Sequence, residues 1–224
     1  MSHQNKITIN THYTRSINLE RDATSVDVVN AYIPTSRALR TFARVADTLH
    51  EEQAPRAWSW IGPYGSGKSA ASVFTGQLLS NPEDEAAIAA IKVLSKADKE
   101  ISKAFKKELK GTTGYIKVLL TGSPEPMGVR IVKSLAESAQ AFWASRRGKT
   151  PAIVDDLNTL KNQEKINVSE IISVVERLQQ ALAKTECAGI LLVIDELGKF
   201  LEYEARHYGA NDIYLLQALA EHAC

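Results

Sequence analysis

The sequence has little cysteine and no long apolar run. Only two cysteines occur among its 224 residues, Cys187 and Cys224, and their spacing matches neither a metal site nor a disulfide framework. No apolar stretch approaches the roughly 18 to 20 residues that a membrane-spanning helix requires. The N-terminus is polar and lacks the apolar region of a signal peptide. These absences argue against a secreted disulfide-rich domain and a membrane protein, and they predict a cytoplasmic location with no membrane partner.

Charge of neither sign dominates the chain. Twenty-seven Lys and Arg residues face 26 Asp and Glu residues, for a formal net charge of +1. The composition therefore provides no global argument for nucleic acid, a membrane surface or an acidic partner, and any such argument must come from local clusters. The hydrophobic fraction of 44% is ordinary for a globular protein and is enough for one good core. The histidines are scattered and predict no metal site: His3, His12, His50, His207 and His222.

Against this ordinary background, one glycine-rich stretch stands out. Gly62–Ser69 reads Gly-Pro-Tyr-Gly-Ser-Gly-Lys-Ser and matches the phosphate-binding pattern G-x-x-x-x-G-K-[ST] at every fixed position. Its glycines let successive backbone N–H groups point at one anion, and a following helix adds the positive end of its dipole. Lys68 would reach the β- and γ-phosphates, and the Ser69 hydroxyl would ligate Mg²⁺. The residues expected to bind nucleotide are Gly62, Pro63, Tyr64, Gly65, Ser66, Gly67, Lys68, Ser69 and Ala70.

The flanks of this stretch provide the context that the motif needs. Ala57–Ile61 is short, apolar and aromatic, and we expect it to form a strand. Ala70–Leu79 has apolar residues at helical spacing, and we expect a helix there. Strand, loop and helix in this order favour a nucleotide site over a glycine-rich turn that arose by chance.

A second motif follows a continuous apolar run. Gly189–Glu196 reads Gly-Ile-Leu-Leu-Val-Ile-Asp-Glu, and a strand that is apolar on both faces is typical of the middle of a parallel sheet. Carboxylates at its C-terminal end lie where ligands bind in open α/β sheets. Asp195 would hold Mg²⁺, and Glu196 would orient and deprotonate the attacking water. The alternative is an acidic pair that only caps a helix.

Several other segments have clear secondary-structure signals. Tyr115–Thr121 is predicted as a buried strand, and Ile17–Leu19 has weaker strand character. Thr35 or Ser36 would cap one helix, and Asn167 or Ser169 another. Further helices are predicted near residues 127–146, 199–204 and 212–223, with a short helix inside 147–166 and a loop from residue 206 to 209. Tyr32–Pro34 either packs over an adenine or makes a plain core contact.

A lysine-rich segment lies between the two motifs. Residues 86–109 contain neither glycine nor proline, and they predict one long helix with its apolar stripe interrupted by Asp98. Lysines recur every three or four residues beside that stripe, at Lys92, Lys96, Lys99, Lys103, Lys106 and Lys110. Such a face would contact a phosphate backbone, or it is simply solvated.

The two motifs together predict a hydrolytic site. Lys68 and the loop N–H groups would hold the phosphates of ATP, Mg²⁺ would be ligated by Ser69 and Asp195, and Glu196 would act as the base. Adenine is favoured over guanine because no N/T-K-x-D guanine-reading motif is present. The Leu-Ser-Gly-Gly-Gln signature of ABC-type ATPases is also absent, and Asp-Glu-Leu-Gly does not match the helicase patterns Asp-Glu-x-Asp or Asp-Glu-x-His.

The loop at Gly62–Ser69 and the strand at Ile190–Glu196 resemble those of AAA+ or STAND-type ATPases of the origin-recognition-like kind. Ile194–Glu202 further resembles large bacterial ATPases, some of which are encoded with anti-phage defence genes. The resemblance implies a parallel sheet flanked by helices, a sensor strand after the acidic pair, arginine fingers and a helical lid.

The chain departs from that pattern after Glu196, because no strand for a sensor and no lid follow. We therefore expect an α/β P-loop NTPase whose ATPase core is incomplete, as in the N-terminal part of a longer protein or one half of a split ATPase. Residues 1–56 would form a leading segment and residues 57–224 the core, with a helical insertion at residues 83–110.

Three functions are consistent with these motifs. The first is an ATPase module that couples nucleotide state to assembly or remodelling, in an oligomer or complex, with nucleic acid or anti-phage defence as candidate settings. The second is an ATP-binding switch or scaffold with little turnover. A small-molecule kinase fits less well, because an acidic pair of this kind favours water as the acceptor of the phosphoryl group. The sequence also shows no pattern that indicates a pocket for another acceptor.

Overall fold

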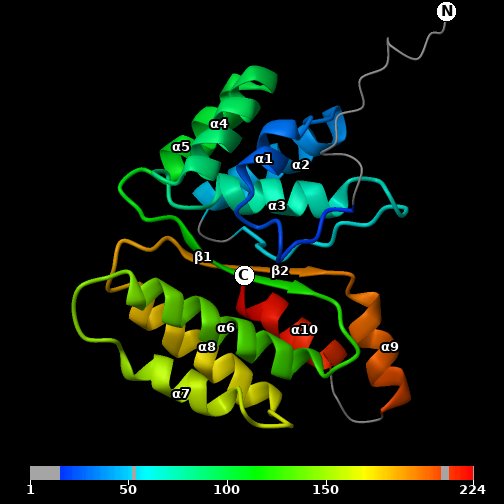
Figure 1. The fold of residues 1–224 in the computed structure, drawn as a ribbon, viewed down its shortest axis with the longest axis vertical. Helices are drawn as coiled ribbons and strands as arrows, with labels where there is room; N and C mark the ends of the chain where they lie inside the picture. The colour runs from blue at the N-terminus through cyan, green and yellow to red at the C-terminus, as the bar shows by residue number, and fades with distance from the viewer. Residues whose placement is uncertain (1–15, 52–53, 208–211, 224) are drawn as a thin grey trace, which may run out of the picture.

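The computed structural model of the chain describes residues 16–51, 54–207 and 212–223. It is a mixed α/β structure, in which a two-stranded parallel sheet lies between two layers of helices (Figure 1). The elements before the sheet are α1 (Val26–Ala31), α2 (Ser36–His50), α3 (Lys68–Leu78), α4 (Glu85–Ala97) and α5 (Lys99–Glu108). The remaining elements are β1 (Tyr115–Thr121), α6 (Met127–Ala144), α7 (Ala152–Leu160), α8 (Val168–Leu182), β2 (Gly189–Asp195), α9 (Gly198–Arg206) and α10 (Asp212–His222).

The sheet pairs the two predicted strands in parallel. The register runs from Tyr115 opposite Gly189 to Thr121 opposite Asp195. Alternate residues of β1 are fully buried, which is the pattern of a strand with one face on a core. Every residue of β2 is half-buried, and within the described residues β2 pairs with β1 alone. Its expected place in the middle of a larger sheet is therefore not seen.

Each face of the sheet has its own apolar core. Below the sheet in Figure 1, α6, α7, α8 and α10 pack with β1 and β2 around buried residues such as Val118, Leu120 and Ile131. Above the sheet, α1 to α5 pack around a second cluster that contains Phe42 and Phe74. The layers arise because β2 is apolar on both faces and β1 has one fully buried apolar face, so helices cover both sides of the sheet. None of the described helices combines the length and apolarity that a bilayer span requires.

Local sequence signals explain most helix boundaries. Thr35 caps α2, because its Oγ1 accepts the Ala38 N–H at 3.3 Å. Asn167 and Glu170 form a capping box at the start of α8. The predicted helices at residues 127–146 and 212–223, the short helix within 147–166 and the helix after Glu196 are all confirmed. The predicted loop after Arg206 includes residues 208–211, which lie outside the described residues.

Two predicted strands were wrong. Ala57–Ile61 is not a strand, and Trp58 and Ile61 are 42% and 85% exposed. A strand needs a hydrogen-bonded neighbour, and no described strand pairs with this segment. Ile17–Leu19 leads into a turn instead, in which the Asn18 N–H donates to Asp22 Oδ2 at 2.9 Å.

The predicted long helix is two helices. It breaks at Asp98, whose φ of −153° is extended, and α4 and α5 pack against each other as a hairpin. The Asp98 carboxylate accepts the N–H groups of Glu100 and Ile101 at 2.9 and 3.0 Å, which stabilises a new helix start. An aspartate therefore ends one helix and caps the next, and the single-helix prediction fails there.

Tyr32 belongs to the upper core. Its ring stacks on Phe74 with a centroid separation of 4.4 Å and contacts Phe42 at 6.3 Å. Burial in this cluster raises the pKa of its phenol to about 12. The core-contact interpretation of Tyr32–Pro34 agrees with this packing, whereas Ile33 is 72% exposed. The helices α1 and α2, which precede the phosphate-loop motif, pack in the same layer as α3 to α5, and the predicted boundary after residue 56 stays a prediction.

Candidate nucleotide-binding site

The phosphate-loop motif forms a tight turn that opens directly into a helix. Gly65 and Gly67 have φ values of +76° and +84°, in the left-handed region that favours glycine. A turn precedes them, in which the Ser66 N–H donates to the Pro63 carbonyl at 3.3 Å. Helix α3 begins at Lys68, and Gly67 at its N-cap supplies no side-chain bond. The first-turn N–H groups are consequently not capped by a side chain.

Lys68 closes the loop on itself. Its Nζ donates to the carbonyls of Gly62 and Pro63, each at 2.9 Å. These carbonyls belong to the first two residues of the motif, so the ammonium holds the two ends of the loop together. The lysine is half-buried, whereas Tyr64 is 93% exposed. In this arrangement the cation is already positioned at the loop.

The direction of α3 determines where the loop lies relative to the sheet. Leu79, directly after α3, accepts the N–H of Tyr115 at 2.8 Å, and Lys117 Nζ donates to Ser80 Oγ at 2.7 Å. The end of α3 is therefore beside the start of β1. Because α3 also packs on β2, it runs back along the sheet for about 16 Å. Its N-terminus points toward the carboxyl ends of the strands, on the side of the arrowheads in Figure 1.

The acidic pair lies at that same edge of the sheet. Asp195 is the last residue of β2 and is half-buried, and Glu196 follows it and is exposed. The Glu196 N–H donates to Asp195 Oδ1 at 2.9 Å. Glu196 has a φ of +52°, which is uncommon for a residue with a side chain. The strand end thus turns sharply at the two predicted carboxylates.

Gly122 permits this sharp turn. Its N–H donates to the Asp195 carbonyl at 2.8 Å, so the ends of the two strands are held together. A Cβ at Gly122 would lie 2.2 Å from the Glu196 carbonyl oxygen, which no side chain tolerates. The approach of Gly122 to Glu196 joins residues far apart in the chain, so its role in placing Glu196 could be found only in the tertiary structure.

Glu196 has an immediate cationic neighbour. Lys199 Nζ lies 2.5 Å from Glu196 Oε2, on the first turn of α9. The hydrogen bond from Lys199 to Glu196 raises the pKa of the Lys199 ammonium. The pair is exposed on both sides, so solvent screens it and it opens at little cost. Lys199 was missed as a site residue, although the spacing of three residues was visible in the sequence.

The far end of β1 contributes further polar groups. The Thr121 hydroxyl is buried without a hydrogen-bond partner in the described part of the chain, at the register position of Asp195. The Thr121 N–H donates to Glu20 Oε1 at 2.6 Å, and Glu20 pairs with Arg130. The segment before α1 is thereby attached to the same edge. No local pattern in the sequence indicated these long-range contacts.

Helix α3 thus points its N-terminus, where the loop ends, toward the sheet edge that carries Asp195 and Glu196. Within the residues described, no group of three or more His, Cys, Asp or Glu side chains could hold a metal ion. His3, His12 and Cys224 lie outside the described residues. Searches against protein-family models, curated proteins and solved structures found no match to this chain. The geometry of the chain itself must therefore support any functional conclusion.

Proposed function

We propose that this chain binds ATP at the Gly62–Ser69 loop and, with Mg²⁺, hydrolyses it. One observation carries the proposal. The stretch that matches the phosphate-binding pattern adopts a glycine turn that opens into α3 at Lys68, and α3 aims its N-terminus at the strand edge that holds Asp195 and Glu196. A helix N-terminus with uncapped N–H groups and a lysine beside it is a favourable environment for phosphate oxygens.

The residues present fit a nucleotide with its cation. Ser69, on the first turn of α3, and Asp195, at the end of β2, supply two oxygen ligands. Mg²⁺ commonly keeps several waters and takes only one or two protein ligands besides phosphates, so a site without a larger acidic cluster suits it. The unpartnered Thr121 hydroxyl at this edge would accept or donate a bond to such a hydrated group. The cation would neutralise charge that develops on the phosphates.

The chain's own residues have distinct roles in this proposal. The Lys68 ammonium gives up or keeps part of its hydrogen bonding to the Gly62 and Pro63 carbonyls, and it contacts the β- and γ-phosphates. Glu196 orients a water molecule and takes its proton. To do so, Glu196 must turn away from Lys199, with which it pairs at 2.5 Å. Adenine remains our choice of base, on the absence of a guanine-reading motif.

That ion pair also favours the second candidate function, an ATP-binding switch or scaffold with little turnover. A Glu196 carboxylate that is bonded to Lys199 is not free to orient a water molecule. If Glu196 stays paired with Lys199 when ATP is bound, the chain would bind nucleotide and signal occupancy without rapid hydrolysis. The two functions share one binding site. They differ in whether Glu196 stays paired with Lys199 or separates from it and acts on a water molecule.

The wider proposal follows the resemblance to AAA+ and STAND-type ATPases. In it, the chain is an ATPase module that acts with a partner subunit or in an oligomer, and it couples nucleotide state to assembly or remodelling. Nucleic acid and anti-phage defence are candidate settings of that coupling. The support is the pair of motifs at one sheet edge.

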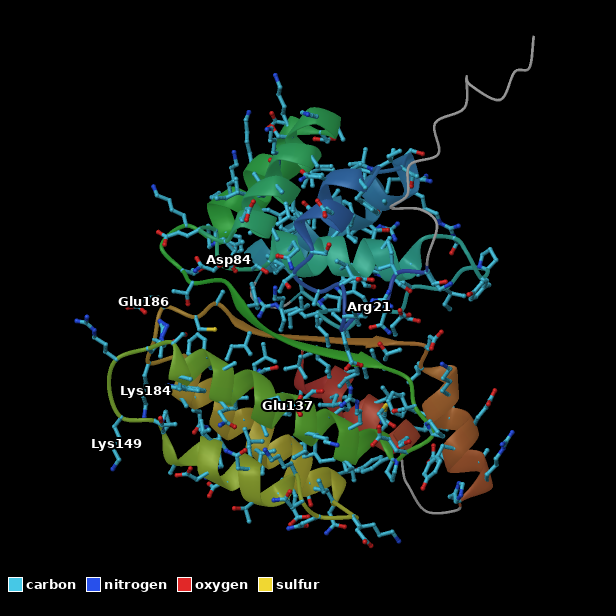
Figure 2. All side chains as sticks on the ribbon, in the orientation of Figure 1. Arg21, Asp84, Glu137, Lys149, Lys184 and Glu186 are labelled. Atoms are coloured by element: carbon cyan, nitrogen blue, oxygen red, sulfur yellow. The ribbon has the colours of Figure 1, made fainter. Side chains whose placement is uncertain are left out.

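Titration calorimetry with ATP and Mg²⁺ tests the binding site. Lys68→Ala should lower ATP affinity by about ten-fold or more, because a charge-assisted contact to phosphate is lost. Lys149→Ala is the matched control, since Lys149 is an exposed lysine of the lower layer (Figure 2) and should leave affinity unchanged. Equal affinity of Lys68→Ala and the unmutated chain would refute the site.

Phosphate release separates the two functions. For an ATPase, Glu196→Gln should keep ATP affinity and lower turnover by about 100-fold, the scale of a lost general base. For a switch, the unmutated chain should already turn over at the level of Glu196→Gln while it binds ATP. Robust turnover that persists in Glu196→Gln would show that Glu196 is not the base.

A further inference from the structure

A groove lies between α4 and α5, away from the nucleotide site. It has a volume of about 530 Å³, and its lining includes Lys92 and Lys96 from α4 and Lys99 and Lys106 from α5. Figure 1 shows these two helices at the end of the upper layer opposite the arrowheads of the strands. The groove therefore shares no residue with the loop or the acidic pair.

The four lysines of the groove have no internal function in the described structure. All four are exposed, and none of them forms an ion pair with another described residue. Their neighbour Lys103 differs, because it pairs with Glu100 at 2.7 Å. Lys99 stands in the first turn of α5, where the helix dipole disfavours a cation. Like charges gathered in one concave place raise the free energy of the unbound chain, and an anionic partner would relieve that repulsion.

The groove also exposes apolar surface. Ile88 is 55% exposed and lines the groove together with the half-buried Ile91. An isoleucine so open to water on the groove side of α4 is a site at which apolar burial would stabilise a complex. The lining thus combines apolar side chains with cationic ones.

The two helices that form the groove are held together by internal contacts. Asp98 caps α5 with two hydrogen bonds, and the Ser102 hydroxyl donates to the Ile91 carbonyl at 3.4 Å across the hairpin. Leu94 and Phe105 are fully buried beneath the two helices. A partner would therefore meet a preformed surface, and little ordering of this chain would oppose binding.

We propose that the α4–α5 groove is a docking site for an acidic amphipathic helix of a partner protein. Apolar residues of such a helix at positions i, i+3 and i+4 would cover Ile88 and Ile91, which is the helix-in-groove mode of recognition. Its Glu or Asp residues four apart would face Lys92 and Lys96, which have the same spacing on α4. Lys99 and Lys106 would pair with carboxylates on the other side.

Nucleic acid fits the same groove less well. A phosphate backbone would pair with the lysines, but its charged ridge offers no apolar partner for Ile88 and Ile91. The lining has no aromatic side chain on which a base would stack, and no arginine for bidentate contacts to bases or phosphates. The combination of lysines with an apolar floor therefore favours a peptide helix.

Fluorescence anisotropy with two labelled probes tests the proposal. One probe is a synthetic amphipathic helix of about four turns, with Leu at helical spacing and Glu on the flanks. The other is a short DNA duplex. The full chain should bind the peptide more tightly than the duplex, and the double variant Lys92→Glu/Lys96→Glu should weaken peptide binding by about ten-fold or more. An Ile88→Asn variant should also weaken it, whereas salt alone should not abolish binding.

The matched control is Lys149→Glu/Lys184→Glu, which changes net charge equally on exposed lysines of the lower layer, away from the groove (Figure 2). This control should bind the peptide as the unmutated chain does, and circular dichroism should show that both double variants fold. Absence of peptide binding, equal loss in the control, or tighter binding of the duplex would each overturn the proposal. None of these readouts depends on nucleotide binding.

Discussion

At the scale of single residues, the groups that carry the proposed chemistry form contacts with neighbouring residues of the chain. Lys68 bonds the first carbonyls of its own loop, and Glu196 pairs with Lys199. These contacts position charged groups without burying them deeply, so ligand binding can exchange them. Asp212 is different, because it is a buried carboxyl with a structural role in the lower layer.

Asp212 provides a prediction about pH. Burial raises the pKa of its carboxyl to about 6, assisted by the nearby Glu204, while the Met127 N–H donates to Asp212 Oδ2 at 3.3 Å. A raised acid pKa means that the folded chain holds the proton more tightly. The protonated Asp212 carboxyl therefore stabilises the folded chain relative to the unfolded one. This contribution is complete below pH 3.8, the ordinary pKa, and is lost as pH rises through about 6.

Asp212→Asn, a neutral side chain of the same shape, should therefore raise the free energy of unfolding at pH 8 by about 3 kcal/mol. The gain should vanish near pH 4, where Asp212 is protonated in the folded chain. Urea titrations of both proteins across this pH range provide the measurement. A difference that stays constant with pH would show that Asp212 ionisation does not contribute.

At the scale of elements, caps and close backbone contacts decide where helices and strands end. Asp98 divides the lysine-rich segment into α4 and α5, and Gly122 lets the ends of β1 and β2 meet. Both features shape a surface on which a proposal rests, since the first forms the groove and the second orients Glu196. Substitutions at such positions should affect stability and the adjacent surface together.

Asp98→Ala should lower the free energy of unfolding by about 1 kcal/mol, because two N–H groups at the start of α5 lose their acceptor. Asp47→Ala is the matched control: Asp47 is exposed in the interior of α2, where alanine is the better helix former. In urea denaturation, the midpoint should thus fall for Asp98→Ala and should not fall for Asp47→Ala. An unchanged midpoint for Asp98→Ala would mean that the break between the helices has another cause.

At the scale of the whole molecule, the loop on the upper layer and the acidic pair of the sheet come from segments about 130 residues apart, and α3 points the end of the loop toward the sheet edge that carries the pair. A ligand that contacts both segments would bind only the folded chain. Such binding stabilises the fold by mass action, and the effect should depend on both the nucleotide and the cation.

ATP with Mg²⁺, at about 100 times its dissociation constant, should add about 2.7 kcal/mol to the stability and raise the Tm by roughly 5 to 10 °C. Removal of Mg²⁺ with EDTA should abolish most of this rise in Tm, because a cation held at Asp195 would no longer neutralise the negative charge of the phosphates. Differential scanning fluorimetry measures both effects. At the same ATP concentration, Lys68→Ala should show about half of this shift or less, because a ten-fold weaker site is less stabilised by mass action. An equal shift with EDTA would argue against a role for the cation.

Features with short-range causes could be recognised in the amino-acid sequence alone. The strands Tyr115–Thr121 and Gly189–Asp195, the cap at Thr35 and the helix that starts beside Lys68 all depend on residues within a few positions of each other. The glycine pattern of the loop likewise reflects local backbone geometry, which the φ values of Gly65 and Gly67 match.

Features with long-range causes depended on the tertiary structure. Ala57–Ile61 has the composition of a strand, but strand formation requires a neighbour that no local pattern can supply. The sequence also could not show the approach of Gly122 to Glu196, or the groove formed when α5 folds back on α4. Periodicity and caps act through adjacent residues, whereas strand pairing and surface shape arise from contacts between residues far apart in the chain. The phosphate-binding pattern of Gly62–Ser69 could therefore be recognised in the sequence alone, whereas the tertiary structure decided toward which edge of the sheet the loop points.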